Sequence, residues 1–233
     1  MIRLFTAAKL SIGQHVYANE NQVHYLFHVM RLKVGDKVLL FNGLDGEFEC
    51  EIIDLNKKAG VFMPLAQTRE QSVENGPVLA MSLIKKDNMD LVLQKATELG
   101  VSEIVPIVAR RSVLQKMNRQ RAEVIVTEAA EQCERLSIPK INEPMDVNTF
   151  LSTCRADEKI VYLSERGQTN GTVKRGEKVC FAIGPEGGWT AEELNAFESH
   201  KTAVALNLGR LILRAETAAI SVLAAYRFDV FGE

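Results

Sequence analysis

The first third of the chain has the pattern of short strands joined by tight turns. As strands require, apolar residues alternate with polar ones, or run together briefly, over residues 3–5, 37–41, 47–53 and 60–68. One stretch with helical spacing, residues 20–30, interrupts them. The dipeptides Asn42-Gly43 and Asp45-Gly46 are typical of tight turns. This pattern predicts a small β-barrel with one short helix.

From residue 78 onward the pattern alternates between strands and helices. Apolar runs typical of strands covered on both faces occupy residues 78–84, 104–108, 159–163, 179–183 and 203–206. Helices are expected after Asp87, over residues 119–135, after the capping box Thr190-Ala191-Glu192-Glu193, and over residues 215–228. Repeated strand–helix units predict an α/β fold with a mainly parallel sheet.

A polar stretch separates these two patterns. Residues 71–77 are polar and end in Gly76-Pro77, which is typical of a linker. We therefore expect two domains, a β-rich one over residues 1–72 and an α/β one over residues 73–233.

Two glycine-bearing segments follow apolar runs near the C-terminus and lead into helices. They are Gly184-Pro185-Glu186-Gly187-Gly188-Trp189-Thr190 and the stretch from Leu206 to Ala218. Ligands of open α/β sheets bind at the carboxyl ends of strands, so these segments predict the rim of a pocket. Two ordinary turns would explain them less well. A bare turn needs neither three glycines in five residues nor a buried-looking Leu-Ile-Leu between two arginines.

Composition and charge narrow the class of protein. Of 233 residues, 46% are hydrophobic and 25% are charged, as in ordinary globular proteins. The N-terminus lacks the apolar core of a signal peptide, and no apolar run reaches the ~18 residues of a membrane span. Four scattered cysteines without CxxC spacing indicate a reducing cytoplasm and no metal centre.

The charge is unevenly distributed. The net charge is −2, yet residues 85–121 carry eight Lys and Arg against four acids, an excess of +4. A basic segment on a mildly acidic body suits a polyanion such as RNA, although a solvated surface explains it about as well.

The common phosphate-binding and hydrolase motifs are absent from the sequence. It contains no GxxxxGK[ST], GxGxxG, GxSxG or HExxH. What remains is a pocket of glycine backbone and aliphatic side chains, which suits an adenine-bearing cofactor without a triphosphate. Glu186, Arg214 and Glu216 are the charged groups at its rim. For Glu216, a structural role as an acid at a helix start is as well supported as a functional role. For Arg214, a functional role is favoured.

A C-terminal signature made of two segments, and three further blocks along the chain, resemble one known family. GPEGGW (184–189) and LNLGRLILRAETA (206–218) are similar to the C-terminal signature of the RsmE-type 16S rRNA uridine-N3 methyltransferases, in the SPOUT class. The blocks HYLFHVMRLKVGD (24–36), KATELGV (95–101) and EAAEQCER (128–135), with Pro139 beyond, resemble that family in the same order. Met30 and Cys133 replace a commoner Leu and Ser, and neither carries chemistry.

The resemblance implies a fold and an activity. The C-terminal domain would be a SPOUT domain whose last segment threads into a trefoil knot, and the N-terminal domain a PUA-like barrel that helps to bind RNA. The protein would be a cytoplasmic homodimer that uses S-adenosylmethionine to methylate N3 of a uridine in the decoding region of 16S rRNA, within the small ribosomal subunit. Alternatives are a SPOUT ribose 2′-O-methyltransferase acting on tRNA or rRNA, and a non-catalytic RNA-binding assembly factor.

Candidate site residues follow from the motifs and the resemblance. We expect the cofactor to be bound by Leu163, Ile183, Gly184, Gly188, Leu206, Leu208, Gly209, Ile212, Leu213 and Thr217. Arg214 is the expected catalytic cation, and Glu186 the residue that takes a proton or orients a water. RNA contacts are expected from Arg3, Arg31, Lys33, Lys85, Lys86, Arg110, Arg111 and Arg135. Arg135 could equally pair with Glu131.

Overall fold

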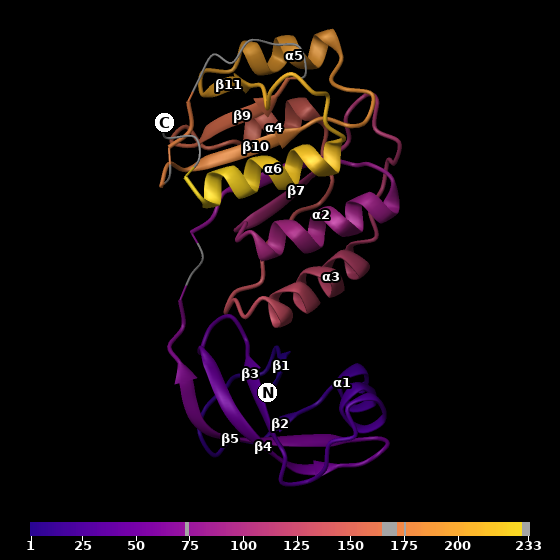
Figure 1. Cartoon of the computed structure of the whole chain (residues 1–233), viewed down its shortest axis with the longest axis vertical. Coiled ribbons are helices and arrows are strands. Elements are labelled where there is room, and N and C mark those ends of the chain that lie inside the picture. Colours follow the sequence, from indigo (N-terminus) through magenta and orange to yellow (C-terminus); the bar gives the residue numbers. More distant parts are fainter. Residues whose placement is uncertain (73–74, 165–171, 175, 230–233) are drawn as a thin grey trace. The chain divides into compact units, whose positions relative to one another are not determined.

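The chain forms two compact units. The computed structural model describes residues 1–72, 75–164, 172–174 and 176–229 (Figure 1). The first unit contains Met1–Glu74 and Ala130–Ile138, and the second contains Asn75–Ala129 and Pro139–Glu233. Nothing in the sequence pattern indicated that the later segment, Ala130–Ile138, joins the first unit. No helix among the described residues is both long and apolar enough to cross a membrane.

A five-stranded sheet, with strand order β1-β3-β4-β5-β2, forms the first unit. Its strands are β1 (Ile2–Phe5), β2 (Val16–Tyr17), β3 (Lys37–Phe41), β4 (Glu47–Leu55) and β5 (Gly60–Arg69). β1 pairs with β3 in parallel, and the other pairs are antiparallel. Register shifts between β4 and β5 are the irregularities that bend sheets. Because β1 and β2 end the strand order, the sheet is a half-barrel.

The alternation predicted for β4 is confirmed. Phe48, Cys50 and Ile52 are buried in the core of the first unit. Burial raises the pKa of the Cys50 thiol to about 12. Cys50 is therefore a packing residue that stays protonated at neutral pH.

Residues 20–30, predicted as one regular helix, contain an α-helical turn followed by a π-helical turn. α1 (Glu20–His24) is followed by a π-helical turn, Tyr25–Val29, in which the Met30 N–H donates to the Tyr25 carbonyl at 2.9 Å. Arg31 then adopts a φ of 55°, a left-handed conformation that few residues other than glycine adopt. The turn therefore ends in a locally strained backbone at an exposed arginine.

Arg3 is buried between β1, β4 and the later segment of the first unit. Its Nε donates to Glu47 Oε2 at 2.6 Å, and its terminal nitrogens donate to the carbonyls of Ala130 at 2.9 Å and Arg135 at 2.7 Å. The guanidinium also lies 3.6 Å from the centroid of the Phe41 ring. Arg3 and Arg135 are only 8% and 6% exposed. This burial does not favour the expected RNA contacts, because phosphate contacts need an accessible guanidinium.

Further contacts attach the later segment to the first unit. The Phe5 N–H donates to Glu131 Oε1, and Arg69 donates to the Glu134 carbonyl, both at 2.8 Å. Phe41, Ala130 and Leu136 form a small buried cluster. The block that resembles EAAEQ…R…P in the family therefore has a structural role in its last part.

A six-stranded parallel sheet forms the second unit, as predicted. Its strands are β6 (Val78–Ser82), β7 (Glu103–Ile107), β8 (Lys140–Ile141), β9 (Lys159–Leu163), β10 (Val179–Ile183) and β11 (Ala203–Leu206). Their order is β11-β9-β10-β6-β7-β8, and every pairing is parallel. The helices are α2 (Lys86–Glu98), α3 (Arg119–Gln132), α4 (Val147–Thr153), α5 (Ala191–Glu198) and α6 (Ala215–Arg227).

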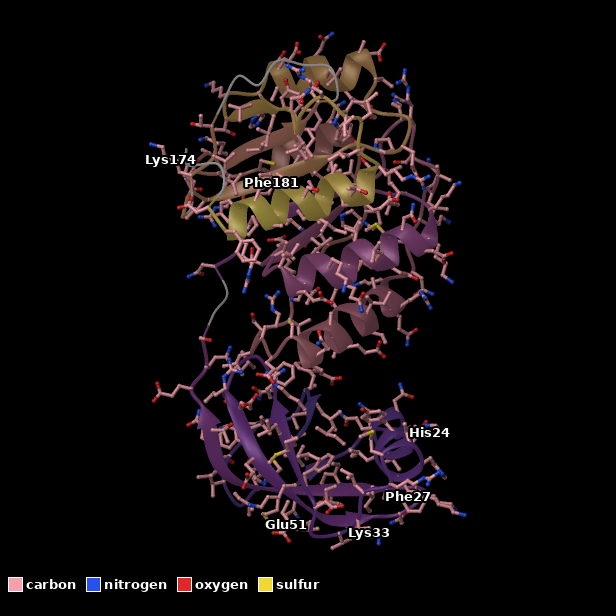
Figure 2. All side chains as sticks on the ribbon, in the orientation of Figure 1. His24, Phe27, Lys33, Glu51, Lys174 and Phe181 are labelled. Atoms are coloured by element: carbon pink, nitrogen blue, oxygen red, sulfur yellow. The ribbon has the colours of Figure 1, made fainter. Side chains whose placement is uncertain are left out.

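Helices cover both faces of this sheet. α2 and α6 contact each other on one face, where Phe181 of β10 packs edge-on against Tyr226 at 5.7 Å (Figure 2). On the other face, Ala182 of β10 shares a core cluster with Phe150 of α4 and Phe197 of α5. Burial on both faces is the physical reason for the continuous apolar runs.

One of the two predicted helix caps is confirmed. Thr190 and Glu193 form the capping box of α5, with the Thr190 N–H donating to Glu193 Oε2 at 2.8 Å. The prediction for Asp87 is wrong, because Lys85 is the N-cap of α2 and Asp87 lies inside the first turn. A carboxylate is favourable there without capping, since it faces the positive end of the helix dipole.

Candidate active site at the carboxyl edge of the parallel sheet

Two loops and the end of a third strand meet at one edge of the parallel sheet. The loops follow β10 and β11, the strand is β9, and carboxyl ends of parallel strands share an edge. The two glycine-bearing segments lie there and lead into α5 and α6, as predicted. Such an edge is the usual ligand site of an open α/β sheet.

The loop after β10 is a tight turn without room for side chains at two glycines. The Gly188 N–H donates to the Pro185 carbonyl at 2.8 Å, and Gly188 has a φ of 68°. A Cβ at Gly184 would lie 3.2 Å from the Trp189 indole, and one at Gly187 would lie 3.1 Å from Arg111 Cβ. The glycines therefore let the backbone pass close to the side chains of Trp189 and Arg111.

Trp189 ties the loop after β10 to the end of β9. Its Nε1 donates to the Leu163 carbonyl at 3.3 Å, and the side chain is buried against Phe197, with ring centroids 5.0 Å apart. The indole thus sets the separation between the loop after β10 and the end of β9. Sequence reasoning did not assign this role, although the position of a lone tryptophan within the motif was a signal.

Asn207 ties the loop after β11 to the end of β9. Its Nδ2 donates to the Ser164 carbonyl at 3.2 Å, while its Oδ1 accepts the Gly209 N–H at 2.8 Å. Gly209 has a φ of 111°, and nothing lies within 4 Å of the place where a Cβ would be. The backbone here is held in a conformation that favours glycine, beside open space.

The aliphatic side chains expected at the pocket divide into buried and exposed ones. Ile183 and Leu206 are buried, whereas Leu163, Leu208 and Leu213 are partly exposed. The Leu-Ile-Leu run was expected to be buried, and this is wrong for its first two residues. Leu211 is 81% and Ile212 65% exposed, because the loop turns outward before α6. Thr217 is exposed in the first turn of α6.

The charged residues at this edge differ in their contacts. Arg214, the N-cap of α6, is exposed, and its guanidinium makes no hydrogen bond or ion pair within the described part of the chain. Glu186 is exposed, and its Oε1 accepts the Lys85 N–H at 3.3 Å. Glu216 is 8% exposed, and its Oε2 has no hydrogen-bond partner among the described residues. Arg214 is therefore a cation at this edge whose guanidinium is available to a ligand.

Four of the predicted RNA-binding residues lie at the same edge. Lys85 and Lys86 follow β6, and Arg110 and Arg111 follow β7, so all four are exposed at carboxyl ends of strands. Arg111 is engaged by the protein itself, since its Nη1 donates to the Gly187 carbonyl at 2.8 Å. Its main observed role is to hold the glycine turn.

The remaining two predicted RNA-binding residues belong to the first unit. Arg31 and Lys33 are exposed after the π-helical turn, and Figure 2 labels Lys33 in the same unit as His24 and Phe27 of the helical segment. The two units therefore carry separate basic residues.

The loops suit an adenosyl group on physical grounds. They offer backbone N–H and carbonyl groups at glycines, partly exposed leucines, and open space beside Gly209. A ligand held this way needs a flat, partly apolar ring system and few charges. The residues present therefore fit S-adenosylmethionine, the cofactor that the motif resemblance implied.

Family models match both units. A model described as an RNA methyltransferase domain matches residues 74–227, and one described as an RNA methyltransferase PUA domain matches residues 18–62. The first model alone covers most of the second unit and more than half of the chain.

Individual relatives match nearly the whole chain. It is 33% identical to the Ribosomal RNA small subunit methyltransferase E of Rickettsia conorii, over 97% of this chain and 94% of that protein. It is 30% identical to the protein of the same name from Bacillus subtilis, over 89% of this chain and 88% of that protein. A crystal structure of Ribosomal RNA small subunit methyltransferase E from Neisseria gonorrhoeae, bound to S-adenosyl methionine, is 28% identical. Its TM-score is 0.88, with 98% of this chain and 97% of that chain covered.

Proposed function

We propose, because the chain belongs to the RsmE family of RNA methyltransferases, that it methylates N3 of a uridine in the decoding region of 16S rRNA with S-adenosylmethionine. The observation that carries this proposal is that the loops after β10 and β11 are both tied to the end of β9 at the carboxyl edge, with the exposed guanidinium of Arg214 beside them. The family and the two-part fold expected from the motifs are confirmed. The atom that is methylated rests on the motif resemblance.

The cofactor would be held by the ends of β9, β10 and β11. The residues assigned to it are Leu163, Ile183, Gly184, Gly188, Leu206, Leu208, Gly209, Ile212, Leu213 and Thr217. Ile183 and Leu206 are buried, so they support the loops from below rather than line the surface. Because Trp189 and Asn207 tie the loops in advance, little ordering is needed on binding, which favours affinity.

Catalysis at N3 requires the removal of a proton. When bound, S-adenosylmethionine supplies a methyl group on a sulfonium, which is already a good electrophile. Uracil N3 becomes a nucleophile only when it loses its proton, so a cation near O2 or O4 lowers the barrier by stabilising the developing anion. Arg214 is exposed and unengaged among the described residues, and we assign it this role. Glu186 is the assigned proton acceptor.

RNA binding would use basic residues of both units. Lys85, Lys86, Arg110 and Arg111 lie at the edge that carries the cofactor loops, and Arg31 and Lys33 lie on the first unit. Phosphate contacts of this kind orient the RNA without reading its sequence. With a net charge of −2, the protein has little general attraction for RNA, which favours the assembled small ribosomal subunit in the cytoplasm as substrate.

A homodimer is part of this proposal. Leu211 and Ile212 present exposed aliphatic side chains beside the proposed cofactor site. Exposed apolar groups at such a place are typical of an interface. A partner subunit that covers them would complete the site and exclude water. The trefoil knot, which the resemblance implies, stays a prediction.

Nucleoside analysis of rRNA tests the proposed function. Small-subunit rRNA from cells that lack the protein is expected to lose 3-methyluridine, as measured by mass spectrometry. The wild-type gene should restore it. Arg214→Ala should lower the rate of methyl transfer about 100-fold or more while cofactor affinity is kept, because it removes a cation that acts on the developing anion. Unchanged 3-methyluridine would reject the assignment, and loss of a ribose-methylated nucleoside would indicate the alternative SPOUT activity.

The role of Trp189 gives a separate prediction. Trp189→Phe keeps an aromatic ring but removes the N–H that binds the Leu163 carbonyl. We expect S-adenosylmethionine affinity to fall about 5-fold, because losing one hydrogen bond of about 1 kcal/mol loosens two cofactor loops. Titration calorimetry measures it. Phe197→Leu is the control, since it disturbs the same aromatic cluster without touching Leu163, and it should leave the affinity unchanged. Equal affinities in both variants would remove this role from Trp189.

A further inference from the structure

A hollow lies at the carboxyl edge of the parallel sheet, beside the loops described above. It has a volume of about 810 Å³ and lies between the loop after β7 and the starts of α4 and α5. Val108 and Val147 give it an apolar wall, and Arg110, Asn148 and Glu192 bring polar groups to it. A volume of this size accommodates a single nucleotide.

The walls of this cavity are continuous with the proposed cofactor site. Thr190, which lines the cavity, directly follows Trp189 in the chain. The Arg110 N–H donates to Glu193 Oε1 at 2.8 Å, and the adjacent Arg111 donates to the Gly187 carbonyl at the same distance. A strand of RNA that delivers its base to the cofactor loops therefore passes next to the cavity.

Three polar groups of the cavity are available to a ligand. The Arg110 guanidinium and the Asn148 side-chain amide make no hydrogen bond or ion pair with any described residue. Glu192 is exposed, and hydrogen bonds from its own backbone N–H and from the Thr190 hydroxyl lower the pKa of its carboxyl, so it is ionised at neutral pH.

The other two carboxylates of the cavity are already engaged. Asp146 accepts from the Thr149 N–H at 3.0 Å and from the Thr149 hydroxyl at 2.7 Å, which caps α4. Glu193 accepts from the N–H groups of Arg110 and Thr190. Glu192 also accepts from its own backbone N–H and from the Thr190 hydroxyl, but its side chain is exposed, so it keeps acceptor positions that a ligand can reach.

The arrangement selects among nucleic-acid groups. Carboxylates inside the cavity repel a phosphate, whereas the guanidinium of Arg110 attracts one. A free carboxylate accepts a hydrogen bond from an exocyclic amino group, which adenine, cytosine and guanine carry and uracil lacks. An amide such as that of Asn148 can donate to and accept from a base edge.

We propose that this cavity binds a nucleotide adjacent to the target uridine, with an amino-bearing base donating to Glu192 and its phosphate held by Arg110. Asn148 contacts the same base. The inference rests on the proposed function for the identity of the RNA, and it adds a site that reads sequence beside the methylated position.

RNA binding by matched variants tests the proposal. The probe is a small-subunit rRNA fragment that contains the target uridine, and fluorescence anisotropy measures its Kd for the full-length protein. Glu192→Gln and Asn148→Ala should each weaken binding about 10-fold, the usual size of one base contact. Glu198→Gln is the control, since Glu198 is an exposed acid of the same helix that does not line the cavity. Loss of one negative charge alone tightens RNA binding slightly, so the two glutamate variants should move in opposite directions.

The base is tested by changing the RNA. Each neighbour of the target uridine is replaced in turn by an analogue without its amino group, such as inosine for guanosine or purine riboside for adenosine. One replacement should weaken wild-type binding about 10-fold and add nothing further in Glu192→Gln, because the lost contact is the same one. The proposal is overturned if Glu192→Gln binds like Glu198→Gln, or if no analogue weakens binding.

Methyl incorporation, measured on the same samples, separates the two proposals. If the wild type binds the fragment with these signatures but incorporates no methyl group, the proposed function fails and the cavity assignment stands. If the wild type methylates the fragment while Glu192→Gln and Asn148→Ala bind it normally, the function stands and the cavity assignment fails.

Discussion

Arg3→Ala is expected to lower the free energy of unfolding of the first unit by about 3–5 kcal/mol. The substitution leaves Glu47 buried, with a side chain 5% exposed, after losing its 2.6 Å partner. It also removes the donors to the carbonyls of Ala130 and Arg135. Glu47 keeps the Thr68 hydroxyl at 3.0 Å and Arg69 at 3.7 Å, but a buried carboxylate that loses its shortest charged partner costs far more than an exposed ion pair contributes.

Two signals measure this effect. The chain has a single tryptophan, Trp189, which lies in the second unit, so its fluorescence follows that unit alone, whereas circular dichroism follows both. When Arg3→Ala is unfolded with urea, the transition followed by circular dichroism should have its midpoint at a lower urea concentration. It should then separate from the transition followed by fluorescence. Lys37→Met is the control, because the Lys37–Glu49 pair is solvent-screened and its loss should change the stability little. Similar losses in the two variants would contradict the interpretation.

Gly209→Val is expected to weaken S-adenosylmethionine binding at least about 100-fold, or about 2.7 kcal/mol, with the fold kept. Gly209 has a φ of 111°, which a β-branched residue does not tolerate, and its N–H holds the Asn207 side chain. A side chain at this position would enter the open space beside the loop, where we place the cofactor. The backbone and the ligand space are therefore both disturbed.

A glycine elsewhere separates strain from loss of the site. Gly13 has a φ of 78° and also has open space around it, but it lies in the first unit. Gly13→Val should therefore cost stability by about the same 1–3 kcal/mol of backbone strain and leave cofactor affinity unchanged. Calorimetric titration and thermal unfolding of both variants measure the two effects. Wild-type affinity in Gly209→Val would reject the assignment of the loop after β11 to the cofactor.

Local patterns predicted the second unit well because its strands have a strong physical signature. β9, β10 and β11 begin and end at the residues where the apolar runs do, since both faces of the sheet are covered. The capping box of α5 was readable because its residues are neighbours in sequence. The short elements β2, β8 and α4 were missed, because two to seven residues carry little periodicity.

Burial that depends on distant partners could not be predicted in this way. Arg3 was assigned to RNA because an arginine in a strand has no sequence mark that distinguishes an inward from an outward side chain. Its partners lie 44 residues away at Glu47 and 127 residues away at Ala130. Leu211 and Ile212 show the converse, since their apolar character suggested burial but the loop exposes them. The activity itself came from the motif resemblance rather than from periodicity or charge.

Because Ala130–Ile138 belongs to the first unit, this unit is discontinuous in sequence and cannot be transferred to another protein as one segment. Cutting the chain at the linker around residue 75 would give a contiguous piece that lacks the two carbonyl partners of Arg3 and the residues Ala130 and Leu136 of the Phe41 cluster. Exchange of the N-terminal piece between homologous chains at that point would join it to a foreign version of the later segment. A chimera that keeps the first unit intact therefore needs further crossover points around Ala130–Ile138 in addition to the one at the linker.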